Sequence, residues 1–416
     1  MVVPIKQRKP SSKNVKGSLK ALPPYLSSKL RIFFTADIVG STNYKQKHAQ
    51  RTVSSDRNGD TVSAKRKKDL HPKWFAPIAD FYSQTQKSLD DEWNDLHNSI
   101  SKELSQDVGD APTFWKTIGD EICFSKLVTS DVCLLAALEA WTQTLVKVRK
   151  MLKEHDSDLD VKSAAWLAGF PIHNTEIILA ANSKSEQSLK DADDDFVYNA
   201  LLLLEKYYEN SGTGTEGLTQ DFVGPSIDTG FRIAAHATPR KMTISVELAY
   251  MCAEASLRLK ESKKGARQQA RDRIVDVTFG YDGRTPLKGV MGGSYYPILW
   301  LDLDTTDGKA NQLNDSESKL LNNSYKDKTK EFRDFCCNFI DHHSTYLCKP
   351  YILDEEEKIV FGDVPSHHAD QKQKLLKIAD WFIQEKAKLK QEEKDLASGS
   401  LDSGTTLKPS DKIKMN

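Results

Sequence analysis

The fold is decided by residues 33–42, which read Phe33-Phe34-Thr35-Ala36-Asp37-Ile38-Val39-Gly40-Ser41-Thr42. The apolar residues predict a buried strand over Leu30 to Asp37. The residues Gly40-Ser41-Thr42 predict a sharp turn into a helix, where unpaired N–H groups and the positive end of the helix dipole favour a phosphate. This stretch therefore predicts a strand that places Asp37 beside a phosphate-binding turn.

A second stretch adds another carboxylate and reads Lys116-Thr117-Ile118-Gly119-Asp120-Glu121. Residues 114–124 predict two strands joined by a tight turn at Gly119-Asp120. Carboxylates at neighbouring strand ends suit hard divalent cations, which prefer oxygen ligands and bridge nucleotide phosphates. We therefore expect Asp37 and Asp120 to bind two divalent cations, Mg²⁺ or Mn²⁺.

The third stretch begins at Asp221 and reads Asp221-Phe222-Val223-Gly224-Pro225-Ser226-Ile227-Asp228-Thr229-Gly230-Phe231-Arg232. A helix is predicted over 227–236. Asp228 and Arg232 are four residues apart, so they project from one face of that helix.

In this order, the three stretches resemble the class III nucleotide cyclases, the family of adenylyl and guanylyl cyclase catalytic domains. The resemblance covers about residues 28–302 and implies a ferredoxin-like α/β (α+β) fold with a βαββαβ core. It implies cation binding by Asp37, Asp120 and the Ile38 carbonyl, a transition-state role for Arg232 at the α-phosphate, and ribose orientation by Asp228. The substrate contacts that we expect are Phe34, Gly40, Ser41, Thr42, Tyr44, Lys116, Asp221 and Lys288.

The same resemblance implies a homodimer. In the family, the two metal-binding aspartates and the arginine of one site come from opposite subunits. A chain with one copy of each set is therefore expected to form two composite sites at the subunit interface.

The residues themselves do not decide which base the nucleotide substrate carries. Lys116 and Asp221 offer a donor and an acceptor, which suit adenine or cytosine and, with exchanged partners, uracil. Asp228 replaces an asparagine usual in adenylyl cyclases, and Tyr44 is an aromatic residue where an aliphatic residue or phenylalanine is common. The segments around both resemble the pyrimidine cyclases of Pycsar antiphage defence, whose cyclic UMP or cyclic CMP activates a separate effector protein. We expect UTP as the substrate. The alternatives are CTP, ATP, or an inactive module that binds nucleotide.

Composition narrows the class of protein. The 416 residues include 59 basic and 59 acidic residues, so the balanced charge does not favour a nucleic-acid partner. The sequence has no apolar run of about 18 residues, so no membrane span is expected. Six cysteines in a chain of this length do not suggest a disulfide framework. A cytoplasmic enzyme is expected.

The predicted organisation has four parts. Residues 1–27 are expected to be a flexible lead, 28–304 a cyclase domain with an insertion at about 45–110, 305–395 a helical extension, and 396–416 a disordered tail. The pairs His342-His343 and His367-His368 match no common zinc-ligand spacing, so zinc binding is not expected. Further helices are predicted from residue 74 and over 132–155, 195–208, 247–259, 313–341 and 371–394, and further strands over 163–171, 242–246, 273–279 and 296–303.

Overall fold

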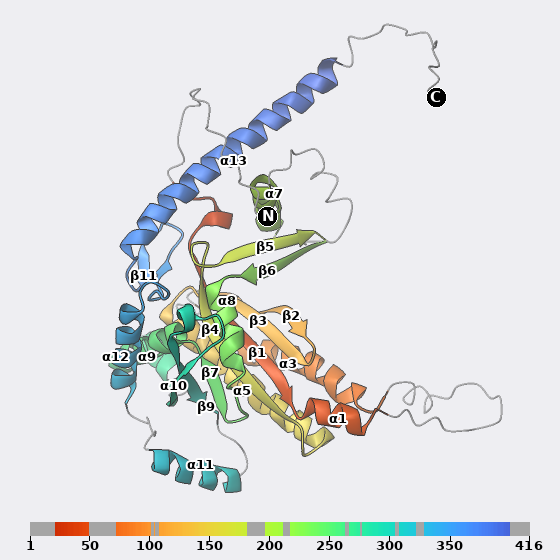
Figure 1. Ribbon diagram of the computed structural model, residues 1–416, viewed down its shortest axis with the longest axis vertical. Helices are drawn as coiled ribbons and strands as arrows, with labels where there is room; N and C mark the ends of the chain where they lie inside the picture. Colours follow the sequence, from red (N-terminus) through yellow and green to blue (C-terminus); the bar gives the residue numbers. More distant parts are fainter. Residues whose placement is uncertain are drawn as a thin grey trace, which may run out of the picture.

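The computed structural model describes residues 21–49, 72–100, 104, 108–180, 196–210, 217–262, 266–274, 277–303, 308–321 and 328–399. Figure 1 shows a central sheet with helices packed against it. In chain order the elements are η1 (Pro24–Leu26), β1 (Lys29–Val39), α1 (Ser41–Lys47), α3 (Phe75–Ser99), β2 (Thr113–Ile118), β3 (Glu121–Leu127), α5 (Asp131–His155), β4 (Asp160–Phe170), β5 (Thr175–Ala180), α7 (Phe196–Glu209), β6 (Leu218–Val223), α8 (Pro225–Ala234), β7 (Lys241–Ile244), α9 (Val246–Glu261), α10 (Ala266–Arg273), β8 (Phe279–Pro286), η2 (Met291–Gly293), β9 (Tyr295–Asp302), α11 (Gly308–Leu321), α12 (Thr329–His342), β10 (Ile352–Leu353), β11 (Ile359–Phe361) and α13 (Ser366–Gly399).

The main sheet has seven strands in the order β2-β3-β1-β4-β7-β9-β8. Neighbouring strands are antiparallel except β4 and β7, which are parallel. The first four strands, with α3 and α5 between them, follow the chain order βαββαβ and lie in the sheet as fourth, first, third and second. This is the ferredoxin-like arrangement, so the predicted mixed α/β fold is confirmed.

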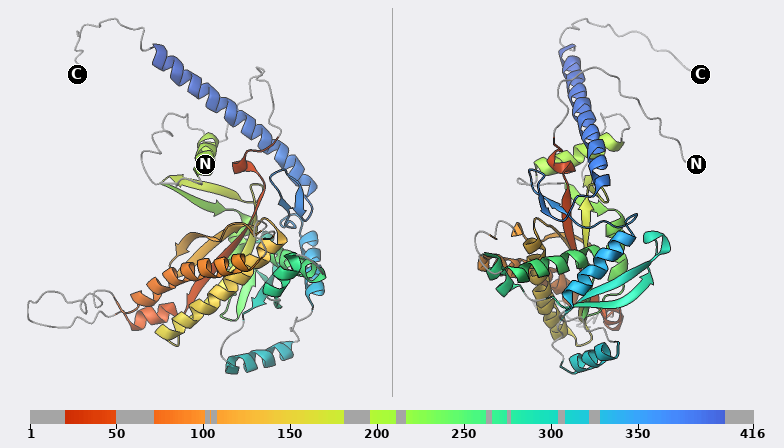
Figure 2. Two further views of the ribbon diagram at one scale, coloured as in Figure 1. Left: turned by 180° about the vertical axis from the view of Figure 1, so that it is seen from behind. Right: turned by 90° about the vertical axis from the view of Figure 1, so that its left-hand side faces the viewer.

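One face of the sheet is covered by α3, α5 and α9. Figure 2 shows α3 and α5 side by side across this face, and the two helices are in extensive contact. Strand residues alternate between the two faces. Ile32, Phe34 and Ala36 therefore all belong to the core on this side, where Phe34 stacks on Trp141 of α5 with ring centroids 5.1 Å apart.

The opposite face has a smaller aromatic core. Phe33 of β1 stacks on Trp166 of β4, and their ring centroids are 5.6 Å apart. Trp115 and Phe222 pack around this pair. Helix α8 lies against β4, with Gly230 directly over the indole ring of Trp166. Both faces of β1 are thus buried at its centre, which explains its nearly continuous apolar sequence.

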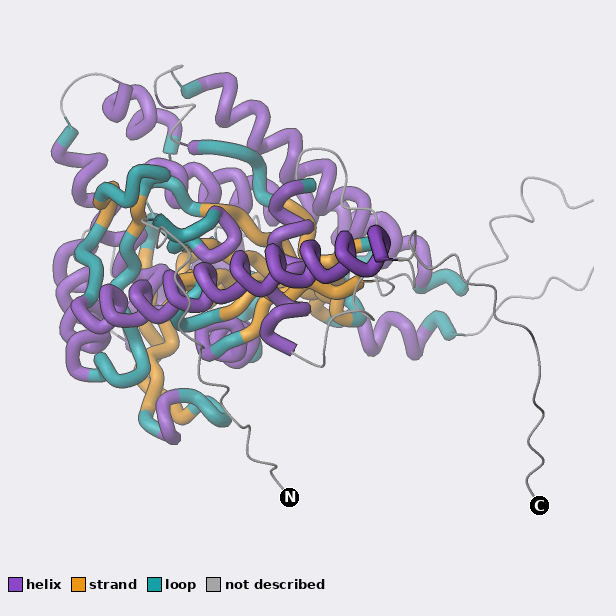
Figure 3. Tube along the Cα trace, turned by 90° about the horizontal axis from the view of Figure 1, so that it is seen from above, coloured by secondary structure: helices purple, strands orange, loops and turns teal. Residues whose placement is uncertain are grey.

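A second structural unit projects from the end of β4. Strands β5 and β6 form a separate antiparallel ribbon, which Figure 1 shows beside α7. Seen from above in Figure 3, the long helix α13 crosses the molecule. Tyr25, Tyr198, Ala379 and Phe382 come from η1, α7 and α13 and share one buried cluster. The part of the predicted flexible lead that the structure describes, residues 21–27, therefore includes packed residues, and residues 1–20 lie outside the described residues.

Most predicted elements are confirmed, with three differences. The strand predicted over 273–279 is wrong, because α10 ends at Arg273 and β8 begins at Phe279. The helix predicted over 313–341 is two helices, α11 and α12. Helix α12 packs on α9 and places Phe332 and Cys336 in the main core, so this part of the predicted extension belongs to the central packing unit. The predicted disordered tail lies largely outside the described residues.

The structure also bears on the expectations about membrane spans and disulfides. Among the described helices, none combines the length and apolar character that a membrane span requires. All six cysteines are free thiols.

Candidate active site

An open cavity of about 670 Å³ lies where β1 turns into α1. Its volume is in the range of small-molecule sites. Gly40 makes the turn possible with φ of 84°, and α1 begins at Ser41. A Cβ at Gly40 would lie 2.6 Å from the Asp158 carbonyl oxygen, so only glycine fits there. The lining residues are Asp37, Ile38, Val39, Gly40, Ser41, Thr42, Asn43, Asp120, Lys162, Ala237, Thr238 and Pro239.

Asp37 and Asp120 reach this cavity from different strands. Asp37 lies near the end of β1, and Lys162 lies directly opposite it on β4, with Lys162 Nζ 3.1 Å from Asp37 Oδ2. Asp120 lies in the tight turn between β2 and β3. Its Oδ2 accepts a hydrogen bond from the Ser41 hydroxyl and lies 3.4 Å from Lys45 Nζ. The structure thus brings the two predicted cation ligands to one cavity.

Two carboxylates at this cavity have a raised affinity for protons, Asp37 and the neighbouring Glu121. Burial raises the pKa of Asp37, and the negative charge of Asp120 raises it further, against the opposing effect of Lys162. The pKa of Glu121, beside Asp37 in the sheet, is also raised by burial and by the charges of Asp37 and Asp120. Carboxylates that repel one another in a partly buried cavity favour a bound cation.

The residues present fit the divalent cations that the sequence implies. Two carboxylates, the Ser41 hydroxyl and the backbone oxygen of Ile38 offer only oxygen donors, which is the donor set that Mg²⁺ and Mn²⁺ prefer. Lys45 and Lys162 already supply positive charge to the two aspartates, as a bound cation would. Asp37, Ile38 and Asp120 are the residues that would hold the ions.

A second group of predicted residues meets where β2 approaches β6. Lys116 Nζ lies 2.9 Å from Asp221 Oδ1, and the Trp115 indole N–H donates to the same oxygen over 2.9 Å. Burial alone would raise the pKa of Asp221, but the hydrogen bonds from Lys116, Trp115 and the Phe222 N–H lower it overall. The predicted donor and acceptor are therefore adjacent, and they are paired with each other.

The residues predicted to act on ribose and α-phosphate lie elsewhere. Asp228 and Arg232 occupy exposed positions on α8, and neither lines the cavity of Asp37. The structure describes no ion pair between these two side chains. Lys288 is exposed and follows β8, the edge strand farthest from β2 in the main sheet. Within one copy of the chain, the proposed cation ligands therefore lie apart from Asp228, Arg232 and Lys288.

Two predicted substrate contacts are placed away from the cavity. The Phe34 side chain is fully buried in the core under α5, so a substrate contact by this side chain is corrected to a packing role. Tyr44 is half-buried and packs against the main core. The centroid of its ring lies 4.5 Å from the centroid of the His48 ring. Neither residue lines the cavity.

Sequence reasoning missed several neighbours of the site. Lys162 and Lys45 contact the two aspartates, Glu121 adds a third carboxylate, and Trp115 anchors Asp221. Glu121 follows Asp120 directly and could have been noticed. Lys162 could not, because its position opposite Asp37 depends on the register between β1 and β4.

The sequence matches no family model and no curated protein. Among solved structures, it is similar to the adenylyl cyclase CyaB from P. aeruginosa, with 8% identity, 68% of this chain and 97% of that chain covered, and a TM-score of 0.37. It is also similar to the guanylate cyclase domain of RhGC from Catenaria anguillulae in complex with GTP, with 11% identity, coverage of 67% and 100%, and a TM-score of 0.33. A class III adenylyl cyclase-like ATP-binding protein from Pseudomonas aeruginosa has 11% identity, coverage of 60% and 41%, and a TM-score of 0.31. Similarity at this level carries no conclusion about activity.

Proposed function

We propose that this chain is a nucleotide cyclase of the class III type that converts UTP to 3′,5′-cyclic UMP and diphosphate. One observation carries the proposal. Asp37 and Asp120, far apart in sequence, meet at an open cavity where Gly40 turns the chain into α1. This is an arrangement of oxygen donors and backbone N–H groups that suits a triphosphate with its cations.

The proposed reaction is an intramolecular displacement. The ribose 3′-oxygen forms a bond to the α-phosphorus, the bond from that phosphorus to the oxygen that bridges to the β-phosphate breaks, and diphosphate leaves. The 3′-hydroxyl proton passes to solvent. Bound divalent cations would lower the pKa of the 3′-hydroxyl and neutralise charge on the phosphates.

The backbone and the side chains around the site have distinct proposed roles. The backbone at Gly40, Ser41 and Thr42 holds the phosphates beside the two aspartates. Arg232 stabilises negative charge that develops at the α-phosphate, where a fixed positive charge has most effect. Asp228, one helical turn earlier, orients the ribose. Lys288 contacts the terminal phosphates.

We also propose that the active site is shared by two copies of the chain. The structure supports this because the cavity of Asp37 and Asp120 does not include Arg232 or Asp228, which are exposed on α8. In a homodimer, the exposed side of α8 in one subunit, which carries Asp228 and Arg232, can complete the cavity of the other. Lys116 and Asp221 would then read the base.

The choice of UTP rests on the resemblance of the segments around Tyr44 and Asp228 to pyrimidine cyclases. CTP is the nearest alternative, and cyclic UMP or cyclic CMP would act as a messenger to a separate effector in antiphage defence. The position of Tyr44 against the core does not add support for a direct contact with the base.

A second candidate, adenylyl cyclase activity, is favoured by the Lys116–Asp221 pair. A lysine donor 2.9 Å from a carboxylate acceptor matches the N1 and N6 groups of adenine. Under this alternative, the product of the same site is cyclic AMP.

Isosteric substitutions of the two aspartates test the cyclase proposal. Asp37→Asn and Asp120→Asn remove charge but keep shape, so folding should persist while turnover with Mn²⁺ falls by at least about 100-fold. Asp158→Asn is the matched control, because this exposed carboxylate pairs with Lys47 near α1 and lies outside the cavity. Full activity in either cavity variant would contradict the assignment of the cation ligands.

A further inference from the structure

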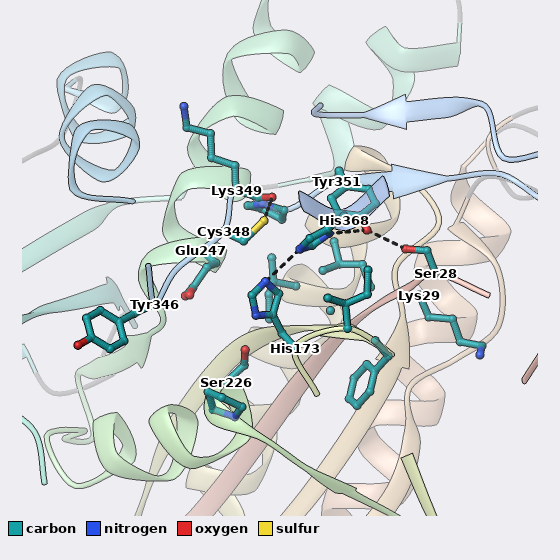
Figure 4. A pocket seen from close by; sticks show the side chains of 17 residues that line it. Ser28, Lys29, His173, Ser226, Glu247, Tyr346, Cys348, Lys349, Tyr351 and His368 are labelled. Carbon is teal, nitrogen blue, oxygen red and sulfur yellow. Dashed lines mark hydrogen bonds between the residues drawn. The ribbon is translucent and has the colours of Figure 1, made fainter. Parts of the chain in front are cut away.

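Three side chains that carry metal-binding atoms converge in a second, small cavity, shown in Figure 4. His173 lies in the turn between β4 and β5, Cys348 in the segment after α12, and His368 in the first turn of α13. The ligand atoms of the three all lie within 4.8 Å of one another. Among the described residues, no other set of three or more histidine, cysteine or acidic side chains brings its ligand atoms this close together.

The spacing of the two imidazole nitrogens matches a tetrahedral site, and the Cys348 sulfur lies within 4.8 Å of the ligand atoms of both histidines. With Zn–N bonds of about 2.0–2.1 Å and Zn–S bonds of about 2.3 Å, two imidazole nitrogens bound to one zinc lie roughly 3.3 Å apart and a nitrogen and a sulfur roughly 3.6 Å apart. His173 Nε2 and His368 Nε2 are 3.1 Å apart. Figure 4 shows the two rings pointing these nitrogens at each other, with the Cys348 sulfur nearby.

Burial shifts the pKa of all three side chains. Burial lowers the pKa of His368 to about 4 and also lowers the pKa of His173. A neutral imidazole offers a lone pair to a metal ion. Burial raises the pKa of the Cys348 thiol to about 11, so an ion that binds here must release the thiol proton.

A neighbouring hydrogen bond fixes the orientation of one ligand. The Tyr351 hydroxyl lies 2.9 Å from Nδ1 of His368, and the Ser28 hydroxyl donates to the Tyr351 oxygen over 3.3 Å. When Nδ1–H donates to Tyr351, Nε2 is left as the free base that points into the cavity. Metal-binding histidines are commonly oriented in this way by a partner on the other ring nitrogen.

We propose that His173, Cys348 and His368 bind one Zn²⁺ ion, with a water molecule beside Glu247 as the fourth ligand. The cavity has about 60 Å³ of space, enough for an ion with a water molecule, and Glu247 lines it. Two imidazoles and a thiolate are the donor set of zinc rather than of magnesium. This inference is independent of the proposed function.

The ion would connect parts of the chain that are distant in sequence. It would join the turn that leads into the β5–β6 ribbon to the segments on either side of β10 and β11. That turn leads to β5, and β5 pairs with β6, which carries Asp221. The proposed zinc therefore holds the C-terminal part of the chain against the part that positions a candidate base contact.

Metal content of the full-length protein tests the proposal. The protein is treated with a chelator, reloaded with Zn²⁺, dialysed and analysed for metal. We expect one equivalent in the wild type and a loss of most of it in Cys348→Ser and His368→Ala. Cys337→Ser and His342→Ala are matched controls of the same residue types that do not line this cavity, and they should keep the full equivalent. Zinc that stays bound in Cys348→Ser would overturn the assignment.

Cobalt substitution gives a second readout that does not depend on whether the variants fold. Co²⁺ bound to a thiolate has an intense sulfur-to-metal absorption band, which the oxygen donors of Asp37 and Asp120 cannot produce. We expect this band when Co²⁺ is added to the metal-free wild type, and we expect excess Zn²⁺ to abolish it. A wild-type protein without the band would overturn the proposal. Failure of the cyclase assay would leave this measurement unchanged.

Discussion

At the scale of single residues, the candidate active site depends on how two carboxylates are held. Asp37 is fixed by its strand and paired with Lys162, whereas Asp120 is held by a turn and contacts Ser41 and Lys45. The sequence identified both aspartates because a buried strand and a Gly-Asp turn are local patterns. It could not identify the lysines, since their approach depends on strand register and on the direction of α1.

Gly40 should be sensitive to substitution. In Gly40→Ala the new Cβ would meet the Asp158 carbonyl oxygen at 2.6 Å, in a backbone conformation with φ of 84° that alanine rarely adopts. We expect a loss of about 3 kcal/mol in the free energy of unfolding, measured with urea. Gly289→Ala is the control, because its φ of 78° is similar but nothing lies within 4 Å, so it should lose only about 1 kcal/mol. Equal losses would contradict the proposed clash.

Lys29 should make stability depend on pH. Burial lowers its pKa to about 8, although Glu176 lies 3.9 Å away. Between pH 8 and its unfolded pKa of 10.5, the unfolded chain binds more protons at this position, so rising pH relieves the penalty of the buried charge. The wild type should therefore gain about 2 kcal/mol relative to Lys29→Met between pH 7.5 and pH 10. Urea unfolding of both proteins at the two pH values measures this, and a constant difference would contradict it.

At the scale of elements, periodicity predicted the central strands and the long helices well. The strands β1 to β4 and helices α5 and α9 have strong patterns of apolar residues. The β5 strand was not predicted, and the residues of β6 were recognised for their chemistry rather than as a strand. The two form a ribbon outside the main sheet, where Ile177 and Leu179 are exposed and give no ordinary core pattern. Helix α10 was missed because its sequence is highly polar and its helical form owes little to an apolar face.

The packing of α8 on β4 yields a prediction at this scale. A Cβ at Gly230 would lie 2.1 Å from the Trp166 ring, which is itself fully buried. In an open helix, glycine to alanine stabilises by about 1 kcal/mol. We expect Gly230→Ala to destabilise by about 2 kcal/mol or more and to reduce turnover, because Asp228 and Arg232 move with the displaced helix. Thermal unfolding and the cyclase assay measure the two effects, and an unchanged or stabilised protein would contradict the close contact.

At the scale of the whole molecule, sequence patterns could not predict contacts between segments that are distant along the chain. The cluster of Tyr25, Tyr198, Ala379 and Phe382 joins both ends of the described chain. The three residues of the proposed zinc site are separated in the same way, so no short spacing pattern could indicate them. Helix α12 likewise joins the main core although the sequence suggests a separate extension.

The proposed sharing of the active site between subunits predicts complementation. Asp120→Ala and Arg232→Ala should each be inactive alone. In a mixed dimer, one of the two sites would combine an intact aspartate pair with an intact arginine. Purified heterodimers made by differential tagging should therefore recover about a quarter to a half of wild-type turnover per dimer. Heterodimers with no recovery would contradict the shared site.

The identity of the reaction product decides between the candidate functions of this protein. The purified protein is incubated with Mn²⁺ and, separately, ATP, GTP, CTP and UTP, and the products are identified by mass spectrometry, with Asp37→Asn as the inactive control. We expect cyclic UMP and diphosphate from UTP, formed by the wild type and not by the variant. Cyclic AMP as the main product would contradict the assignment of a pyrimidine cyclase, and no cyclic nucleotide from any of the four would contradict the proposed cyclase activity.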